Sequence, residues 1–279
     1  MTYRSLLLHV DSSPLCPARS NLAISLAQAM ECHLVGLAPT GLLTLPVVPE
    51  AAIPLAEFSA MAWEFVNDKA RQASEQLRQS CVTAGLKSFE ALVDVADEAE
   101  SLVRHSHCSD LVMLSQPDPT AFGHRADQAM LEQVLMHSAR PSLVLPYTGT
   151  FTAVGQRVLV AWDQSREAAR AVADALPLLR RAQQVEVISW TEGSDGDTPT
   201  RPSLDALRQW LLWHGVAAEV RSASTTIGIA DTMLSHAADF DADLIVMGAY
   251  GHARWTERLL GGATRDLLAS MTVPVLMSH

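Results

Sequence analysis

The sequence has no long apolar run. No stretch approaches the roughly 18–20 uninterrupted apolar residues that a membrane-spanning helix needs, and the short run at residues 6–8 ends at His9, too soon for the core of a secretion signal. Yet 48% of the residues are hydrophobic and only 18% are charged, which is ample for buried cores and untypical of a disordered chain. We therefore expect a folded, cytoplasmic protein with no membrane partner.

Lysine is scarce as well. Of the 20 basic residues only Lys69 and Lys87 are lysines, and neither follows a glycine. A phosphate-binding loop of the Walker A type needs a Gly-Lys pair, so this class of nucleotide site is excluded. The formal charge of −11, with arginines scattered along the chain, also argues against a nucleic acid partner, because backbone phosphates must be neutralised by clustered cations.

Few residues suggest catalysis or metal binding. None of the four cysteines has a neighbour at C-x-x-C spacing, so we interpret them as small buried hydrophobic residues. His105 and the pair His107-Cys108 have metal-ligand chemistry, but no second close pair accompanies them, and a stable zinc site uses four convergent ligands. No G-x-S-x-G nucleophile motif occurs, and no acidic pair is spaced for a magnesium-dependent transferase. The sequence therefore indicates no catalytic residue and no metal site.

An internal repeat organises the chain. Residues 110–115 (DLVMLS) resemble residues 243–248 (DLIVMG) at an offset of 133. In both copies a proline stands 26 residues after the end of this run, at Pro141 and Pro274, and another short apolar run follows it. The match needs no gap, so the chain consists of two copies of one unit.

The front parts of the two copies match at other offsets. Residues 5–11 parallel residues 157–163 at an offset of 152, whereas Gly85 pairs with Gly215 at an offset of 130. The first copy therefore carries 22 additional residues, which fall at about 39–60. This insertion holds four prolines, so we expect an extended loop or a lid there.

Short apolar runs alternate with helical patterns in both copies. Such alternation is typical of the α/β class, with a parallel sheet, right-handed crossovers and helices on both faces. We predict two tandem doubly wound domains, at residues 1–149 and 155–279. The elements expected in the second domain are strands at about 157–162, 185–190, 217–222, 243–248 and 273–277 and helices at 166–181, 202–214, 229–240 and 262–270.

Glycines cluster after the fourth strand of the second domain. Gly248 and Gly251 can adopt positive φ and let the backbone approach a ligand, and Gly261 and Gly262 directly precede a helix. The unpaired N–H groups of a helix start, together with the positive end of its dipole, suit a phosphate. At the matching positions the first domain has Ser115, Asp118, Gln128 and Ala129, so we expect that domain to be structural and free of nucleotide.

This segment resembles the Gly-x2-Gly-x9-Gly-(Ser/Thr) fingerprint of the ATP-binding universal stress proteins, and the following TVPVLM is similar to that family's closing strand. The resemblance implies that the three glycines contact phosphates and ribose, that Asp163 lies beside the adenine, and that the backbone of Thr191 contacts the adenine ring. One position departs from the fingerprint: Gly262 supplies no hydroxyl for a phosphate. The full candidate site is Asp163, Thr191, Gly248, Gly251, Arg254, Gly261, Gly262, Ala263 and Thr264.

The function that the resemblance implies is a stress-response protein that holds ATP, ADP or AMP, with or without Mg²⁺, in its second domain and acts by regulation. Two alternatives stay open, a nucleotide-free scaffold of the same fold and a weak ATP hydrolase. The family pairs domains through their final strands, so residues 142–147 and 273–278 should pair within this chain as an internal pseudo-dimer. The sequence leaves open a further homodimer and the identity of protein partners.

Overall fold

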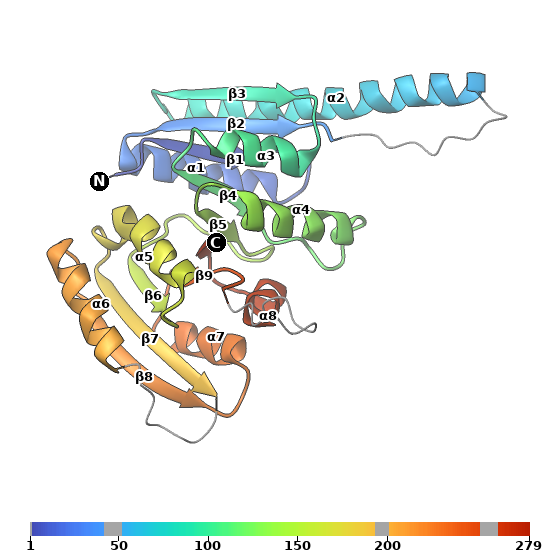
Figure 1. Ribbon diagram of the computed structural model, residues 1–279. Coiled ribbons are helices and arrows are strands. Elements are labelled where there is room, and N and C mark those ends of the chain that lie inside the picture. Colours follow the sequence, from blue (N-terminus) through green and yellow to red (C-terminus); the bar gives the residue numbers. More distant parts are fainter. Residues whose placement is uncertain (1, 42–51, 193–200, 252–261) are drawn as a thin grey trace.

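The computed structural model describes residues 2–41, 52–192, 201–251 and 262–279 (Figure 1). The first half of the chain contains β1 (Ser5–His9), α1 (Cys16–Met30), β2 (His33–Pro39), α2 (Ala52–Thr83), β3 (Phe89–Asp94), α3 (Glu98–Ser106), β4 (Leu111–Ser115), α4 (His124–His137) and β5 (Ser142–Leu145). The second half contains β6 (Arg157–Ala161), α5 (Arg166–Leu179), β7 (Gln184–Glu192), α6 (Arg201–Trp213), β8 (Glu219–Thr225), α7 (Ile229–Asp239), β9 (Leu244–Gly248), α8 (Gly262–Ser270) and β10 (Val275–Ser278).

The strands form one sheet in the order β3-β2-β1-β4-β5-β10-β9-β6-β7-β8. Every pair is parallel except β5 with β10, which is antiparallel. Each half therefore has the doubly wound order, in which the chain runs from β1 to one edge and then returns to the other side of β1. The predicted α/β class with two tandem parallel-sheet units is confirmed.

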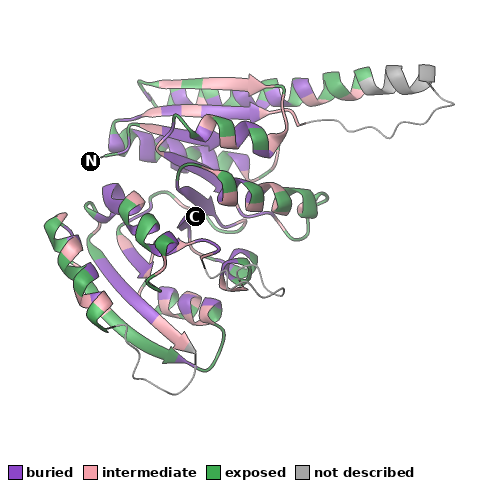
Figure 2. Ribbon diagram, viewed as in Figure 1, coloured by how far each residue is buried: buried purple, intermediate pink, exposed green. Residues whose placement is uncertain are grey.

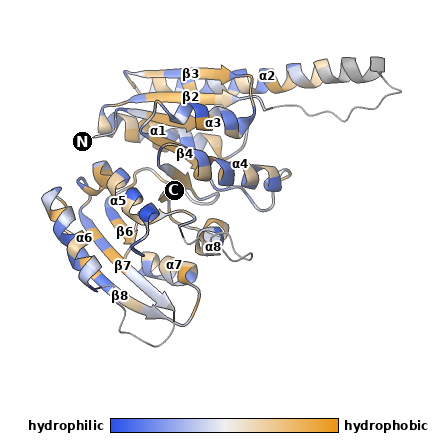
Figure 3. Cartoon of the chain, viewed as in Figure 1, coloured by the Kyte–Doolittle hydropathy of each residue, from blue (hydrophilic) through white to orange (hydrophobic). Residues whose placement is uncertain are grey.

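Two hydrophobic cores lie on opposite faces of this sheet. Leu6 and Leu8 of β1 belong to the core formed with α1, α2, α5 and α6, whereas Leu7 belongs to the core formed with α3, α4, α7 and α8. Because successive side chains of a strand alternate in direction, a strand covered on both faces must be apolar throughout. Figure 3 shows hydrophobic residues gathered on strands such as β2 and β3, and Figure 2 shows that the edge strand β8 is mostly exposed.

The strand registers reproduce the repeat. In the first half Leu6 pairs with Leu111, and in the second half Val158 pairs with Leu244, so the fourth strands of the two halves match at 244 − 111 = 133. The ends of the second helices match as well, because Gly85 and Gly215 both have positive φ, 70° and 78°. Both glycines terminate their helices where a left-handed residue is required, which fixes the offset of 130 there.

The two halves join through their final strands. Leu143 and Val144 of β5 pair with Leu276 and Val275 of β10 in an antiparallel register. This confirms the predicted internal pairing, although both strands are shorter than predicted. The buried hydroxyl of Tyr3 adds a contact, since it donates a hydrogen bond of 2.8 Å to the carbonyl of Asp174 in α5.

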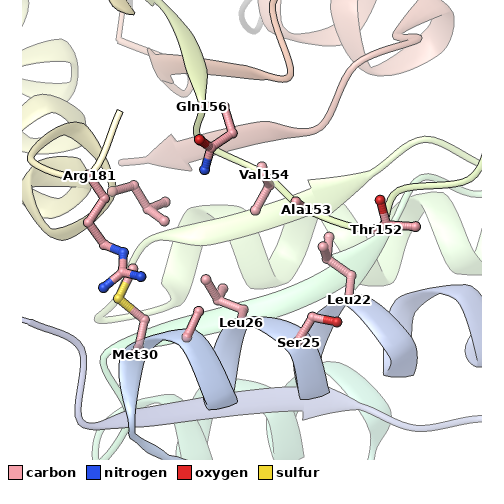
Figure 4. Close-up of a pocket in the computed structure, with 12 residues that line it drawn as sticks. Leu22, Ser25, Leu26, Met30, Thr152, Ala153, Val154, Gln156 and Arg181 are labelled. Atoms are coloured by element: carbon pink, nitrogen blue, oxygen red, sulfur yellow. The ribbon is translucent and has the colours of Figure 1, made fainter. Parts of the chain in front are cut away.

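A small hollow remains between the halves (Figure 4). Leu22, Leu26 and Met30 of α1 face the linker residue Val154, and Arg181 stands at the rim. The cavity measures about 90 Å³, well below the roughly 300–1,000 Å³ typical of ligand pockets. We interpret it as imperfect packing at the junction of the halves.

The insertion of the first half differs from the expectation. Residues 42–51 lie outside the described residues, but α2 already begins at Ala52, so the predicted loop is wrong over 52–60. Pro54 stands in the first turn of the helix, where a proline costs no hydrogen bond. The insertion thus largely lengthens a helix: α2 has 32 residues and its counterpart α6 has 13, and Figure 1 shows α2 extending past the sheet. In the described part of the chain, no helix is long and apolar enough to cross a membrane.

Candidate functional site

The turn between β6 and α5 is built by Asp163 and Ser165. The carboxylate oxygen Oδ1 of Asp163 accepts hydrogen bonds from the backbone N–H of Ser165 at 2.9 Å and from its hydroxyl at 2.6 Å. Ser165 is the N-cap of α5, and its side-chain oxygen accepts a hydrogen bond from the N–H of Ala168 at 3.0 Å. A short polar cap of this kind satisfies donors that the first helical turn leaves unpaired. The turn therefore fixes Asp163 at the carboxyl end of β6, as the sequence predicts.

Gly248 ends β9 in close contact with the start of α5. A Cβ atom at this position would lie 2.5 Å from the backbone nitrogen of Ala168 and 2.7 Å from the carbonyl carbon of Glu167. A Cβ atom at Gly251 would lie 2.9 Å from Oε2 of Glu167. Gly248 is thus required by the approach of the helix backbone to the strand end, whereas a side chain at Gly251 would have to displace the end of the Glu167 side chain.

The expected positive φ at Gly248 and Gly251 is wrong. The left-handed residue of this loop is Tyr250, with φ 56°, and neither glycine has a φ in that region. The reason is that the glycines serve close packing, while the loop turns at the residue between them. The N–H of Tyr250 donates a hydrogen bond of 3.2 Å to the hydroxyl oxygen of Thr264, which holds the strained turn in place.

Thr264 brings the start of α8 to the glycine loop. This buried threonine is the third residue of α8 and reaches back to Tyr250. Gly262 begins the helix, and a Cβ atom added there would meet no described atom within 4 Å. Ala263 is half-buried beside it. The hydroxyl of Thr264 thus joins the start of α8 to the loop that follows β9.

Glu167 places a carboxylate beside the glycines. The residue is 6% exposed, and its Oε1 accepts hydrogen bonds from Arg166 at 2.7 and 2.9 Å. Burial opposes ionisation, but the backbone N–H of Glu167 and the Arg166 guanidinium outweigh it and hold the pKa of this carboxyl below its usual range. An ionised carboxylate therefore borders the loop, with its charge largely compensated by Arg166.

The structure brings together some of the predicted site residues and leaves others undescribed. Asp163, Gly248, Gly251 and the α8 residues Gly262, Ala263 and Thr264 lie around the ends of β6 and β9, which are adjacent in the sheet. Thr191 lies near the end of β7, the other neighbour of β6, and is half-buried. Arg254 and Gly261 fall outside the described residues.

Two residues of this site, Glu167 and Tyr250, are not apparent from the sequence. A carboxylate beside an anion site runs against the expected charge pattern, and the left-handed position of Tyr250 has no sequence signature because tyrosine rarely adopts it. Only their positions in the sequence could have indicated these two residues. Glu167 stands in the first turn of the helix that follows the Asp-x-Ser turn, and Tyr250 stands between the two glycines.

The matching place in the first half is filled by an arginine. Asp11 and Ser13 repeat the turn of Asp163 and Ser165 with the same distances, 2.9 and 2.6 Å. Arg19, only 1% exposed, donates to the carbonyl of His9 at 2.8 Å, to the hydroxyl of Ser115 at 2.6 Å and to Asp11 at 3.0 Å. Burial of Asp11 opposes its ionisation, but Arg19 and His9 outweigh that effect and lower its pKa far below the usual range. The Arg19 guanidinium thus joins the ends of β1 and β4 in the first half. In the second half, Gly248 stands at the position of Ser115 and packs against α5 instead.

Histidine, cysteine and acidic side chains do not gather into a metal site anywhere in the described ranges. A group of three or more such residues that could hold an ion is absent from residues 2–41, 52–192, 201–251 and 262–279.

Comparison with known proteins identifies the domain. Residues 155–279 match the model of the universal stress protein family. A universal stress protein from Archaeoglobus fulgidus DSM 4304 has a similar structure, with 19% sequence identity and a TM-score of 0.76 over 98% of this chain and 95% of that one. A putative universal stress protein from Pseudomonas aeruginosa UCBPP-PA14 is also similar, with 16% identity and a TM-score of 0.57 over 99% and 93% of the two chains.

A third structure, a functionally unknown protein from Pseudomonas aeruginosa PAO1, has 16% identity and a TM-score of 0.55 over 99% of this chain and 92% of that one. At these identities the structural similarities establish the fold of the whole chain, and the family match concerns the second half. Residues 155–279 thus match the universal stress protein family, and the whole length of the chain has the fold of two such domains.

Proposed function

We propose that the second domain binds an adenine nucleotide, ATP, ADP or AMP, and that the bound state serves regulation in a stress response. One observation carries the proposal. The starts of α5 and α8 lie beside the same strand end, because Gly248 is packed against α5 and Thr264 holds the loop to α8. Two helix N-termini beside one glycine loop favour an anion such as a phosphate chain.

The nucleotide is oriented between the start of α8, which binds its phosphates, and the ends of β6 and β7, which bind its adenine. The phosphates lie in the open space before Gly262, where the N–H groups of the first turn of α8 can donate to them. The adenine lies toward Asp163 and Thr191, at the ends of the adjacent strands β6 and β7. A Mg²⁺ ion, when present, is held through the phosphates, since this ion commonly binds with the phosphates of its nucleotide.

A regulatory output is favoured because α8 contacts the first half. The buried amide of Gln116, just after β4, donates a hydrogen bond of 2.8 Å to the carbonyl of Leu268 in α8. Arg265 of α8 also lies 3.9 Å from Glu132 of α4. A ligand that repositions the first turn of α8 therefore acts on contacts that cross between the halves.

Two other functions have weaker support. A nucleotide-free scaffold is motivated by the missing hydroxyl at Gly262 and by the Glu167 carboxylate beside Gly251. A weak hydrolase requires a group that orients the attacking water, and the carboxylates of the described site, Asp163 and Glu167, are engaged by Ser165 and Arg166.

The deciding experiment uses Gly262, because a side chain fits there. We expect mass spectrometry to detect an adenine nucleotide released from the denatured protein, and calorimetry to detect ATP or AMP binding. The Gly262→Asp variant places a negative charge where the phosphates bind, without a packing clash, and should lose binding at unchanged thermal stability. Gly228→Asp, at the N-cap of α7, is the matched control and should bind like the parent protein. Absence of nucleotide together with absence of binding by the parent protein would favour the scaffold.

A further inference from the structure

A polar groove lies between α1 and α2 of the first half. It measures about 280 Å³ and is lined by the β1–α1 loop and by the facing sides of the two helices. It touches Asp11 and Ser13 at one end and reaches Ser80 near the end of α2. The groove therefore lies on a helical face of the sheet and continues well away from the loops that follow β1 and β4.

The second half contains tryptophans at the matching positions. At the offsets fixed above, Trp162 matches Val10 and Trp210 matches Ser80. The indole N–H of Trp162 donates a hydrogen bond of 2.9 Å to the hydroxyl of Ser203 on α6, so this side chain spans from the strand end to the helix. Trp210 is half-buried and also packs against the core. Two large aromatic side chains thus occupy a region where the first half has a valine and a serine.

The residues that line the groove are also more polar than their counterparts in the second half. Ser20 and Asn21 of α1 stand where α5 has Val172 and Ala173, and Gln76 of α2 stands where α6 has Ala206. Ser20 is buried, as Val172 is, whereas Asn21 and Gln76 are exposed, as Ala173 and Ala206 are. Here hydroxyl and amide groups replace apolar ones at facing positions.

The lining groups remain available to a ligand. In the described parts of the chain, the side chains of Asn21, Gln72 and Gln76 make no hydrogen bond to the protein, and all three are exposed. Lys69 is the one cation among the described lining residues, and its ammonium lies 4.5 Å over the ring of Phe65. The charge of Asp11 is already compensated by Arg19.

We propose that this groove binds a small polyhydroxylated anion of about monosaccharide size, such as a sugar phosphate or a sugar acid. Amides and hydroxyls donate to and accept from sugar hydroxyls, and Lys69 pairs with the anionic group. The volume of about 280 Å³ lies just below the roughly 300–1,000 Å³ range of ligand pockets, which suits a single ring better than a nucleotide.

The test uses the full chain with glucose 6-phosphate and gluconate as probes. We expect saturable binding of at least one of them in calorimetry, with NMR shifts confined to the α1–α2 groove. Lys69→Met should weaken that binding about tenfold to a hundredfold, because a hydrogen bond to a charged group is lost. Ser80→Trp, which restores the aromatic residue of the second half, should abolish it.

Several outcomes separate this proposal from its rivals. Preference for glucose 6-phosphate identifies a phosphate as the anionic group, and preference for gluconate identifies a carboxylate. Binding of inorganic phosphate with equal affinity, binding of neither probe, or binding that both variants leave unchanged overturns the proposal. Binding of ATP, measured on the same samples, should be unchanged in both variants, since it concerns the other half.

Discussion

Gly262 is the residue at which the second domain departs from the family fingerprint, and a Cβ atom there would meet no described atom within 4 Å. On the proposed function, a serine there adds a hydroxyl that can bind the phosphates, and it displaces no described atom. Hydrogen bonds of this kind contribute about 0.5–3 kcal/mol, depending on the charge of the acceptor. We therefore expect Gly262→Ser to tighten ATP binding by roughly threefold to a hundredfold in calorimetry. Unchanged or weaker binding would mean that the phosphates lie elsewhere.

Arg19 and Asp11 form a charge pair in which the arginine is almost wholly buried. Because the pKa of Asp11 is lowered in the folded state, its stabilisation is complete above the ordinary carboxyl pKa and is lost only as the pH falls through the lower folded value. Asp11→Asn leaves the buried guanidinium uncompensated, so we expect a loss of about 3–5 kcal/mol in the free energy of unfolding at pH 7, measured in urea.

The matched control for this prediction is Asp163→Asn. Asp163 makes the same turn with Ser165, but Ala171 stands where the first half has Arg19. The control should lose no more than about 1 kcal/mol. The difference between the two variants should shrink in acid, where Asp11 itself becomes protonated. Equal losses at pH 7 would show that Arg19 does not depend on Asp11.

Single residues show where sequence reasoning stops. The Asp-x-Ser turns could be predicted because their hydrogen bonds are local. The role of Gly248 could not, since its reason is a helix that approaches from elsewhere in the chain. Arg19 lies in a helix whose sequence gives no sign that a guanidinium is buried, and its three partners come from β1, the β1–α1 turn and β4. Long-range contacts of this kind are absent from a local pattern.

Among the elements, β7, β8 and α7 are joined by one buried carboxylate. Glu186 of β7 is 2% exposed, and its oxygens lie 2.7 Å from Nε of Arg221 and 2.8 Å from Nε2 of His236. We expect Glu186→Ala to cost about 1–3 kcal/mol of unfolding free energy, because it removes an ion pair with an edge strand and a hydrogen bond with a helix.

Glu219 provides the control for this prediction. It contacts the same arginine at 3.6 Å but is 80% exposed, so Glu219→Ala should change stability by less than about 1 kcal/mol. Urea unfolding of both variants makes the comparison. If Glu219→Ala lowered the unfolding free energy as much as Glu186→Ala does, the burial of Glu186 would not be the cause of the stabilisation.

The elements of the second half agree with the predicted ones to within a few residues, because their apolar runs are bounded by clear helix and strand periods. The insertion of the first half was the exception. Four prolines predict a break, yet Pro54 stands in the first turn of α2, where proline is compatible with a helix. A count of prolines cannot distinguish a helix start from a loop.

At the scale of the whole molecule, the two halves share one continuous sheet. Fusion of two copies makes their pairing intramolecular, so the antiparallel contact of β5 with β10 forms at high effective concentration. The same contact gives each half a neighbour for a strand that would otherwise be an exposed edge. The halves should therefore unfold together, and the stability of the second half should depend on the first.

Leu276 tests this dependence, because it is fully buried and pairs with Leu143 across the junction. Leu276→Lys places an ammonium in the core that both halves share, which costs several kcal/mol. We expect calorimetric unfolding at a temperature lower by more than about 6 °C, with the two halves melting separately. Leu212→Lys, at a position 58% exposed on α6, is the matched control and should change stability by no more than about 0.5 kcal/mol. An unchanged melting temperature in the Leu276→Lys variant would mean that the strand pairing does not hold the halves together.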